Sequence, residues 1–269
     1  MKKIGFVGAG NMAGALIRGL LRSGHSKAED MWASDPVDVQ LRRLKRLHKI
    51  EVTRDNRALV RQSQTIILAV KPQSMASVLD EVRPEVTPRK LFVSIAAGFP
   101  LRRIEAGLGG QARVVRVMPN TPVLVGRGIS VAVAGSKATP ADLRQTLRLF
   151  KGVGEAVSIT GEDLLDAVTA LSGSGPAFVY SFAESLAEGG VRGGLPQTLA
   201  QQLAYATIAG AAAMLAESGL STRELRDMVV SPGGTTQAGL TALEAHHFRD
   251  ALIAAVEAAT RRARELAAA

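Results

Sequence analysis

The sequence predicts an α/β fold in two parts: a mostly parallel sheet domain at residues 1–160, followed by an all-helical dimerisation domain at residues 161–269. Two observations predict this division. In the first part, short apolar runs alternate with helical patterns, and this alternation is typical of βαβ units that form a parallel sheet covered by helices. After residue 160 the strand patterns stop, and every later pattern is helical.

The expected elements of the first part follow one another as strand and helix. The strands are Lys3–Val7, Met31–Ser34, Thr65–Val70, Leu91–Ile95, Val114–Val117, Gly128–Ala134 and Gly154–Ile159. The helices between them are Asn11–Arg22, Val37–Leu47, Asn56–Gln62, Ser74–Val82, Leu101–Gly107 and Pro140–Lys151. In such doubly wound sheets, ligands bind beyond the carboxyl ends of the strands.

The second part consists of apolar helices with little room to bury them. The expected helices are Glu162–Gly190, Pro196–Ser218, Thr222–Val229, Thr235–Ala245 and Phe248–Ala267. The first two are apolar almost all round, and such helices need burial on every side. Residues 161–269 alone offer little interior, so we expect an intimate homodimer through this half.

One uncharged run, from Gly193 to Ala216, is long enough to cross a bilayer. It contains Pro196 and three glutamines and is mostly alanine. We therefore interpret it as a buried helix and expect no membrane association. The N-terminus does not resemble a signal peptide, because the apolar run after the first lysines is too short.

Composition narrows the functional classes. The chain has no cysteine, which excludes disulfides, thiolate nucleophiles and cysteine-ligated metal and fits a cytoplasmic protein. The net charge of +9 is uneven, because residues 1–160 hold 26 Lys and Arg against 12 Asp and Glu, and residues 161–269 hold 7 against 12. The basic residues are scattered and no basic motif contains aromatic residues, so we expect no nucleic-acid partner. A small phosphorylated ligand fits the basic half.

The first strand ends in a glycine-rich turn, Gly8-Ala9-Gly10-Asn11-Met12-Ala13, which has the pattern G-x-G-x-x-A between a strand and a helix. In such turns Gly8 permits the tight bend, Gly10 lets the backbone approach a pyrophosphate, and Ala13 lets helix and strand pack closely. The helix N-terminus then offers N–H groups to phosphates. The pattern predicts a dinucleotide-binding domain of the Rossmann type; the alternative is a tight turn without a ligand.

The end of the second strand bears on the choice between NADPH and NADH. Asp35 is the acid that an NAD enzyme uses for the ribose 2′-hydroxyl, whereas Ser34, Arg42 and Arg43 suit the 2′-phosphate of NADP. The two arginines can equally form a solvated helix face. We favour NADPH, with NADH as the alternative.

Three further strand ends carry small residues and backbone groups that suit a flat nicotinamide ring. They are Ala69-Val70-Lys71-Pro72, Ser94-Ile95-Ala96-Ala97-Gly98, and the segment from Arg116 to Pro122, which contains Asn120. Together they outline one crevice beyond the carboxyl ends of the strands.

A second glycine-rich turn, Ser231-Pro232-Gly233-Gly234-Thr235-Thr236, precedes a helix in the helical half. Such a turn forms a nest of N–H groups for a phosphate or a carboxylate. The alternative is a structural turn in which Thr235 caps the helix.

Several catalytic patterns are absent from the sequence. There is no G-x-S-x-G, no H-E-x-x-H and no Asp, Glu or His cluster at metal spacing, so we expect no metal. The four histidines, His25, His48, His246 and His247, fall at expected surface or helix-end positions, so we expect no histidine base. An oxidoreductase without an evident proton donor fits a substrate that arrives protonated, such as an iminium ion, which accepts hydride directly.

The chain resembles the pyrroline-5-carboxylate reductase family from end to end. The matching blocks are GFVGAGNMA at 5–13, AVKPQ at 69–73, AAG at 96–98, MPNTP at 118–122, EDLLDAVTALSGSGPAF at 162–178 and SPGGTT at 231–236. The resemblance implies a Rossmann domain and a helical domain interlocked in a dimer, often within a ring of dimers. It implies reduction of (S)-1-pyrroline-5-carboxylate to L-proline by NAD(P)H, the last step of proline biosynthesis.

The motifs and the resemblance together give candidate site residues. For the cofactor these are Gly8, Ala9, Gly10, Asn11, Met12, Ser34, Asp35, Asn56, Ala69, Val70, Lys71, Pro72, Ala96, Ala97, Gly98 and Asn120; Asn56 matches a contact on the adenosine side. For the substrate they are Glu162, Ser231, Gly233, Gly234, Thr235 and Thr236. The resemblance implies that Thr236 hydrogen-bonds the ring nitrogen and that the Glu162 carboxylate lies near the iminium, whose charge an anion would stabilise.

Two other functions remain open on the sequence alone. One is a related imine or β-hydroxyacid reductase; many of these carry a catalytic lysine in the helical half, and residues 161–269 contain none. The other is a non-catalytic NADPH-binding protein. The turn at 231–236 argues against it, because a cofactor sensor needs no substrate site.

Overall fold

The computed structural model describes residues 2–268, which form two compact units. Unit 1 contains the residues up to Ser174 together with those from Ala259 onward, and unit 2 contains Gly175–Ala258. The units thus divide the chain at other places than the predicted boundary after residue 160. The reason is packing. Leu165 and Ala170 follow the predicted boundary but are fully buried in unit 1, and Leu165 belongs to the core of the sheet.

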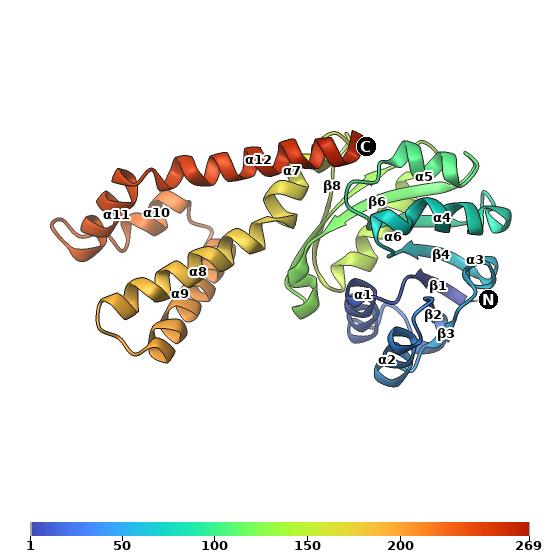
Figure 1. Ribbon diagram of the computed structural model, residues 1–269, viewed down its shortest axis with the longest axis horizontal. Coiled ribbons are helices and arrows are strands. Elements are labelled where there is room, and N and C mark those ends of the chain that lie inside the picture. The colour runs from blue at the N-terminus through green and yellow to red at the C-terminus, as the bar shows by residue number, and fades with distance from the viewer. Residues whose placement is uncertain (1, 269) are drawn as a thin grey trace. The chain divides into compact units, whose positions relative to one another are not determined.

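Unit 1 is built on an eight-stranded sheet with the order β3-β2-β1-β4-β5-β6-β7-β8 (Figure 1). The strands are β1 Lys2–Val7, β2 Met31–Ser34, β3 Glu51–Thr53, β4 Ser63–Leu68, β5 Leu91–Ser94, β6 Arg113–Pro119, β7 Gly128–Ala134 and β8 Gly154–Ser158. From β3 to β6 all neighbours are parallel; β7 is antiparallel to β6, and β8 is parallel to β7. The predicted mostly parallel sheet is confirmed.

The strand order changes direction between β1 and β4: the chain adds β2 and β3 on one side of β1, and then β4, β5 and β6 on the other. A doubly wound sheet opens its ligand crevice at this switch point, beyond the carboxyl ends of the strands. The turns after β1, β2, β4 and β5 are therefore the ones that position a site.

One strand was absent from the sequence prediction. β3 is a three-residue edge strand, Glu51-Val52-Thr53, that pairs only with β2. It has one apolar residue, so its sequence contains no apolar run that would distinguish a strand from a loop. Tertiary pairing with a buried neighbour, not local pattern, makes it a strand.

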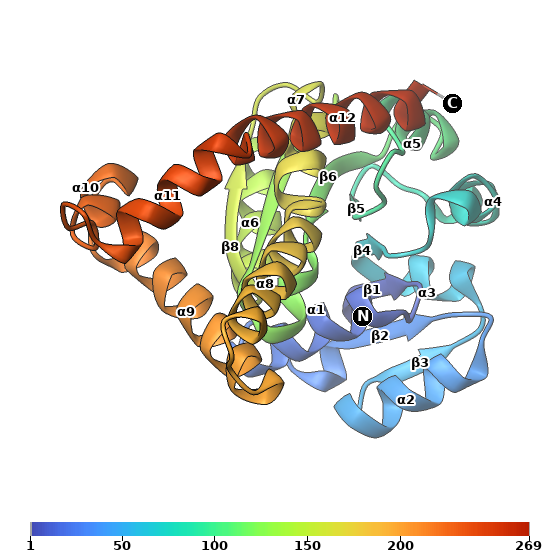
Figure 2. The same cartoon turned by 60° about the vertical axis from the view of Figure 1, so that its left-hand side comes forward.

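Helices cover both faces of the sheet (Figure 2). They are α1 Asn11–Arg22, α2 Asp38–His48, α3 Asn56–Gln62, α4 Pro72–Val82, α5 Leu101–Gly107 and α6 Pro140–Lys151, with short 3₁₀ turns at Ala28–Asp30, Arg83–Glu85 and Thr121–Val125. One core layer contains Phe6 and packs against α1, α2 and α6. The other contains Phe92 and packs against α3, α4 and α5. Unit 1 thus forms its apolar core within one chain.

The later helices are α7 Leu164–Val168, the π-turn η4 Thr169–Gly173, α8 Gly175–Arg192, α9 Gln197–Glu217, α10 Thr222–Asp227, α11 Thr235–Ala245 and α12 Phe248–Ala268. The predicted single helix Glu162–Gly190 is therefore wrong in its middle. The hydroxyls of Thr169 and Ser172 donate to carbonyls four residues back, at 2.7 and 2.9 Å. Side chains that bond to the helix backbone in this way loosen it.

Gly173 in η4 packs closely against a side chain of the sheet. A Cβ atom added to Gly173 would lie 2.8 Å from Met118 Cε on β6. The turn therefore packs on the sheet through bare backbone, and a larger residue there would have to displace Met118.

Unit 2 has almost no interior of its own. Its two long helices α8 and α9 lie side by side (Figure 1). On α9 only Ala200 and Ala204 are buried, whereas Leu203 is 49% and Tyr205 is 55% exposed. Among the described residues, α9 is the one helix whose length and mean hydropathy of 1.3 suit a membrane span. The expectation that it is buried on every side is not met within a single chain.

Candidate active site

The turn after β1 has the backbone geometry that the glycine pattern predicts. Gly8 has a φ angle of +101°, which favours glycine, and its N–H donates to Ser34 O at 2.8 Å. A Cβ atom added to Gly8 would lie 2.7 Å from Ala69 O. Gly8 therefore allows the ends of β1, β2 and β4 to meet at one point.

Gly10 leaves room where a phosphate would approach. It precedes α1 as its N-cap and no side chain caps that helix. A Cβ atom placed on Gly10 would have no neighbour within 4 Å. An uncapped helix N-terminus offers N–H groups and a partial positive charge to an anion. The residues here fit a dinucleotide pyrophosphate, with Asn11 exposed and Met12 partly packed against the core.

Asp35 binds the glycine-rich turn through its carboxylate. Its Oδ2 accepts from Ala9 N at 2.8 Å and its Oδ1 accepts from Val37 N at 2.8 Å. Both oxygens are thus bonded to main-chain amides, so Asp35 holds the turn after β1 against the turn after β2. This is a structural role beside the predicted contact with the ribose.

Arg43 reaches the same turn from α2. It donates to Asn11 Oδ1 at 2.8 Å and to Ala9 O at 3.3 Å. Its guanidinium therefore lies at the dinucleotide turn and does not belong to a solvated helix face. Arg42 instead borders a shallow depression on α2 together with Lys45, Arg46 and Lys49.

Ser34 and Asn56, both predicted at the adenosine side, are hydrogen-bonded to each other. Ser34 is fully buried and its hydroxyl donates to Asn56 Oδ1 at 2.6 Å. The amide nitrogen of Asn56 donates to Glu81 Oε2 at 2.8 Å. Glu81 was not predicted, and its position on the solvent face of α4 gives no sequence signal.

The turns after β4 and β5 lie at the same sheet edge. Lys71 is exposed and precedes α4, in which Pro72 is the first residue; Ala97 is also exposed. Ala69 and Val70 are half-buried, and Ala96 is buried, with its N–H 3.4 Å from Ser94 Oγ. Gly98 has a φ angle of +67°. The structure thus brings the predicted cofactor residues of β1, β2, β4 and β5 to one edge.

Two predicted residues are bonded within the protein. Asn120 is 9% exposed and its Oδ1 accepts from Ile129 N at 3.0 Å, which fixes the connection from β6 to β7. Glu162 accepts with one oxygen from Arg116 Nη1 at 2.6 Å and from Leu101 N at 2.7 Å. The Glu162 charge is therefore already compensated, which weakens its predicted role beside an iminium.

Arg116 begins a segment that was predicted to border the crevice, but it was not among the candidate site residues. It is 4% exposed and lies on β6, where Ser94 is its neighbour on β5. The sequence contains a signal, because Val-Val-Arg-Val-Met places a charge inside an apolar strand. A charge in such a place needs a partner, and Glu162 supplies it.

The turn at 231–236 lies in unit 2 and keeps helix N–H groups free of side-chain caps. Gly233 has a φ angle of +71° and its N–H donates to Gln237 Oε1 at 2.7 Å, while Gly234 N donates to Ser231 O at 3.0 Å. The N-cap of α11 is Gly234 and no side chain caps it, so the alternative with Thr235 as cap is wrong. Ser231 and Thr235 are exposed and Thr236 is half-buried.

Comparison with known proteins assigns the family. Residues 162–266 match the family model for pyrroline-5-carboxylate reductase dimerisation, and residues 3–98 match that for NADP oxidoreductase, coenzyme F420-dependent. A pyrroline-5-carboxylate reductase of Methanosarcina acetivorans is 45% identical over 265 residues, 98% of either chain. The chain belongs to the pyrroline-5-carboxylate reductase family. The resemblance stated from the sequence blocks is confirmed.

Solved structures agree with the family. The pyrroline-5-carboxylate reductase of Coxiella burnetii superposes with a TM-score of 0.93 at 33% identity and covers 98% of both chains. The pyrroline carboxylate reductase of Plasmodium falciparum, solved with NADP bound, gives a TM-score of 0.87 at 34% identity and covers 99% of this chain and 98% of its own. The fold of a Rossmann-type domain and a helical dimerisation domain is thereby confirmed.

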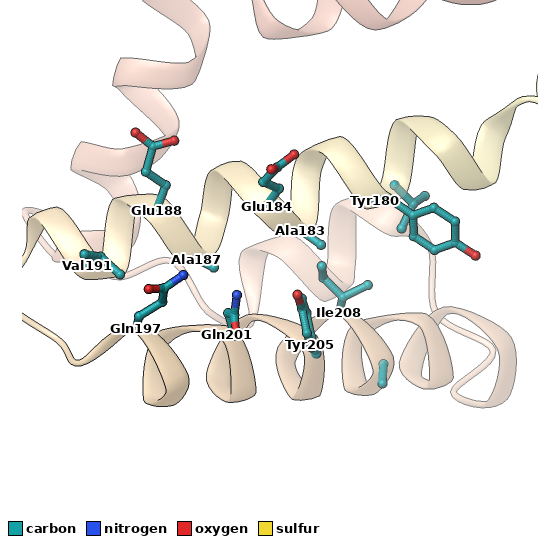
Figure 3. A pocket seen from close by; sticks show the side chains of 12 residues that line it. Tyr180, Ala183, Glu184, Ala187, Glu188, Val191, Gln197, Gln201, Tyr205 and Ile208 are labelled. Atoms are coloured by element: carbon teal, nitrogen blue, oxygen red, sulfur yellow. The ribbon is translucent and has the colours of Figure 1, made fainter.

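The dimerisation region of the family model covers the helices with exposed apolar side chains, so this chain self-associates. Between α8 and α9 lies a groove of about 910 Å³ (Figure 3). Tyr180, Val191 and Ile208 supply apolar surface, and Glu184 and Glu188 line its α8 side. Such an open apolar groove is typical of a surface that a partner covers.

Proposed function

We infer that this chain reduces the C=N bond of (S)-1-pyrroline-5-carboxylate to give L-proline, the last step of proline biosynthesis. The observation that carries this function is likeness over the whole chain to reductases of that name, at 45% identity. The glycine-rich turn with its open space at Gly10 supplies the cofactor site that such a reductase needs.

Catalysis rests on positioning and not on a covalent intermediate. A bound reduced nicotinamide dinucleotide supplies the hydride. Gly10 and the N-terminus of α1 would bind its pyrophosphate, and Asp35 and Arg43 hold that turn in place. Exposed backbone at the ends of β4 and β5 provides a surface for the ring. Holding donor and acceptor in a reactive geometry is worth several kcal/mol, on the order of 7–11 at best.

We propose that the turn at 231–236 binds the substrate. The Ser231 hydroxyl and the backbone of Gly233–Thr236 would hold the carboxylate, with the N–H groups of Thr235 and Thr236 as donors because those of Gly233 and Gly234 bond within the protein. The Thr236 hydroxyl would hydrogen-bond the ring nitrogen. The uncapped N-terminus of α11 supports this, because it offers donors and positive dipole to an anion. The absence of lysine from residues 161–269 counts against a lysine-dependent hydroxyacid reductase.

The chain uses NAD(P)H, and we propose NADPH as the preferred form. Arg43 at the dinucleotide turn and the second amide hydrogen of half-buried Asn56 support a 2′-phosphate, and buried Ser34 holds that amide in place. NADH remains the alternative donor.

The assembly and location of the protein are further proposals. We expect a homodimer through α8 and α9, within a ring of dimers as the family resemblance implies. We also expect a cytoplasmic protein with no nucleic-acid or membrane partner. The scattered basic residues and the lack of cysteine support this placement.

The test is oxidation of NADPH and NADH, followed by nicotinamide absorbance, with 1-pyrroline-5-carboxylate as substrate. Rapid turnover with a higher kcat/KM for NADPH is the expected result. A folded dimer that binds NADPH but turns over no cyclic imine would replace this function by the non-catalytic alternative. Turnover of other imines alone would indicate the imine-reductase alternative.

A further inference from the structure

A chain of three side chains begins beneath the end of β2 and leads to the surface of α4. Ser34, fully buried, donates to Asn56 Oδ1 at 2.6 Å, and Asn56 Nδ2 donates to Glu81 Oε2 at 2.8 Å. A carboxylate can only accept hydrogen bonds, so Glu81 fixes which end of the amide faces outward. The orientation of Asn56 is thus set by residues on two other elements.

The Glu81 charge is not neutralised by its basic neighbours. Arg57 and Arg61 lie on α3, the helix that begins at Asn56, and both pair with Glu85, at 3.0 and 2.7 Å. Within the described residues Glu81 forms no ion pair. A full negative charge therefore stands next to Asn56, on the side of the crevice where the family resemblance places the adenosine ribose.

We propose that Glu81 is a specificity-determining residue that weakens binding of the cofactor's 2′-phosphate relative to a 2′-hydroxyl. This inference rests on the proposed cofactor site. A phosphate monoester carries close to two negative charges at neutral pH, so a nearby carboxylate repels it. A hydroxyl is neutral and escapes this repulsion. Glu81 thereby limits a preference for NADPH that Arg43 and the Ser34–Asn56 pair favour.

The charge and the hydrogen bond of Glu81 are separable by substitution. Glu81→Gln keeps an acceptor for Asn56 Nδ2 and removes the charge. Asp80→Asn removes the same charge from the neighbouring exposed position of α4 and serves as the matched control. Glu81→Ala removes both the charge and the acceptor.

The experiment is direct titration of NADPH and NADH into each variant without substrate, followed by nicotinamide fluorescence. We expect Glu81→Gln to tighten NADPH by about three- to tenfold and NADH by less than about twofold, since only NADPH carries the 2′-phosphate and both cofactors share the pyrophosphate. The gain should shrink at high salt, where surface charges are screened. Asp80→Asn should leave the NADPH to NADH ratio unchanged.

Several results would overturn the proposal. They are an unchanged ratio in Glu81→Gln, an equal change for both cofactors, or the same shift in Asp80→Asn. Glu81→Ala tests positioning: if it weakens both cofactors while Glu81→Gln shifts only NADPH, hydrogen bond and charge act separately, as proposed. Because binding is measured without substrate, a lack of turnover would refute the proposed reaction and leave this result standing. Loss of NADH binding in Glu81→Gln would instead overturn the selective role.

Discussion

The two units carry apolar side chains of the same kinds but place them differently. In unit 1 Phe6, Phe92 and Phe150 are at most 1% exposed, between the sheet and its helices. In unit 2 Phe182 is 40%, Leu203 is 49% and Tyr205 is 55% exposed. A large exposed apolar surface marks an interaction site. The comparison teaches that unit 1 forms its core within a single chain, whereas unit 2 needs a second copy to cover its apolar helices.

The largest effect is expected where this contrast is sharpest. Leu203→Glu places a charge on the exposed face of α9 and should abolish the dimer, because burying an unpaired charge is prohibitive. Sedimentation or light scattering gives the association state. Val39→Glu is the matched control, since Val39 on α2 is 63% exposed but lies in unit 1. A Leu203→Glu protein that stays dimeric would refute the role of this face.

A smaller effect is expected inside unit 1, independent of protein concentration. Arg116→Met leaves the Glu162 carboxylate without its cation, and we expect a loss of about 2–4 kcal/mol in the free energy of unfolding. Urea titration measures it. The double variant Arg116→Met/Glu162→Gln should recover part of the loss, because no charge then stays unpaired. Equal stability of wild type and Arg116→Met would contradict the importance of this pair.

The substrate turn of unit 2 should affect catalysis more than stability. Thr236→Ala should lower kcat by tens-fold, on the order of 2 kcal/mol, through loss of one hydrogen bond to the reacting nitrogen. Ser231→Ala should mainly raise KM for the imine. Steady-state kinetics separates the two, and NADPH affinity, a property of unit 1, should not change. Unchanged kcat/KM in both variants would remove this turn from the site.

The smallest effect concerns His48 at the end of α2. Burial, with the positive charges of Arg18 and Arg43, holds the pKa of His48 below its usual value of 6.5. The folded state therefore binds a proton less readily than the unfolded state, and stability falls as pH decreases below 6.5. His48→Gln should flatten that part of the stability curve, measured by thermal unfolding across pH. A curve of unchanged slope would exclude His48 as its source.

The sequence predicted the parts of unit 1 that depend on local pattern. Alternating apolar runs fixed most strands, and the spacing of Gly8 and Gly10 predicted the turn after β1. β3 was absent from the prediction because its strand state depends on pairing with β2 and not on its own residues. The π-turn η4 was missed because the spacing of apolar residues along a helix does not reveal one extra residue in a single turn.

The site was predictable in its residues but less so in their partners. Asp35 and Glu162 were expected to face ligands, yet their oxygens accept bonds from main-chain amides and Arg116. Residue spacing cannot distinguish a carboxylate that binds a ligand from one that bonds within the protein, because either can occupy the same loop position after a strand. Glu81 lies on an exposed helix face, where a charge is ordinary. Only the contact with Asn56 distinguishes it.

Unit 1 is discontinuous along the chain, since it includes the residues from Ala259 onward as well as those up to Ser174. A ribosome makes these residues after those of unit 2. During synthesis the chain can therefore form the sheet early, but unit 1 still lacks its last residues. At that stage α8 and α9 are made, and their apolar faces are still exposed. Domains generally fold in the order in which they are made. Here unit 1 begins to fold first, but its last residues are made only after unit 2. Unit 1 therefore finishes folding at about the same time as unit 2 becomes able to dimerise.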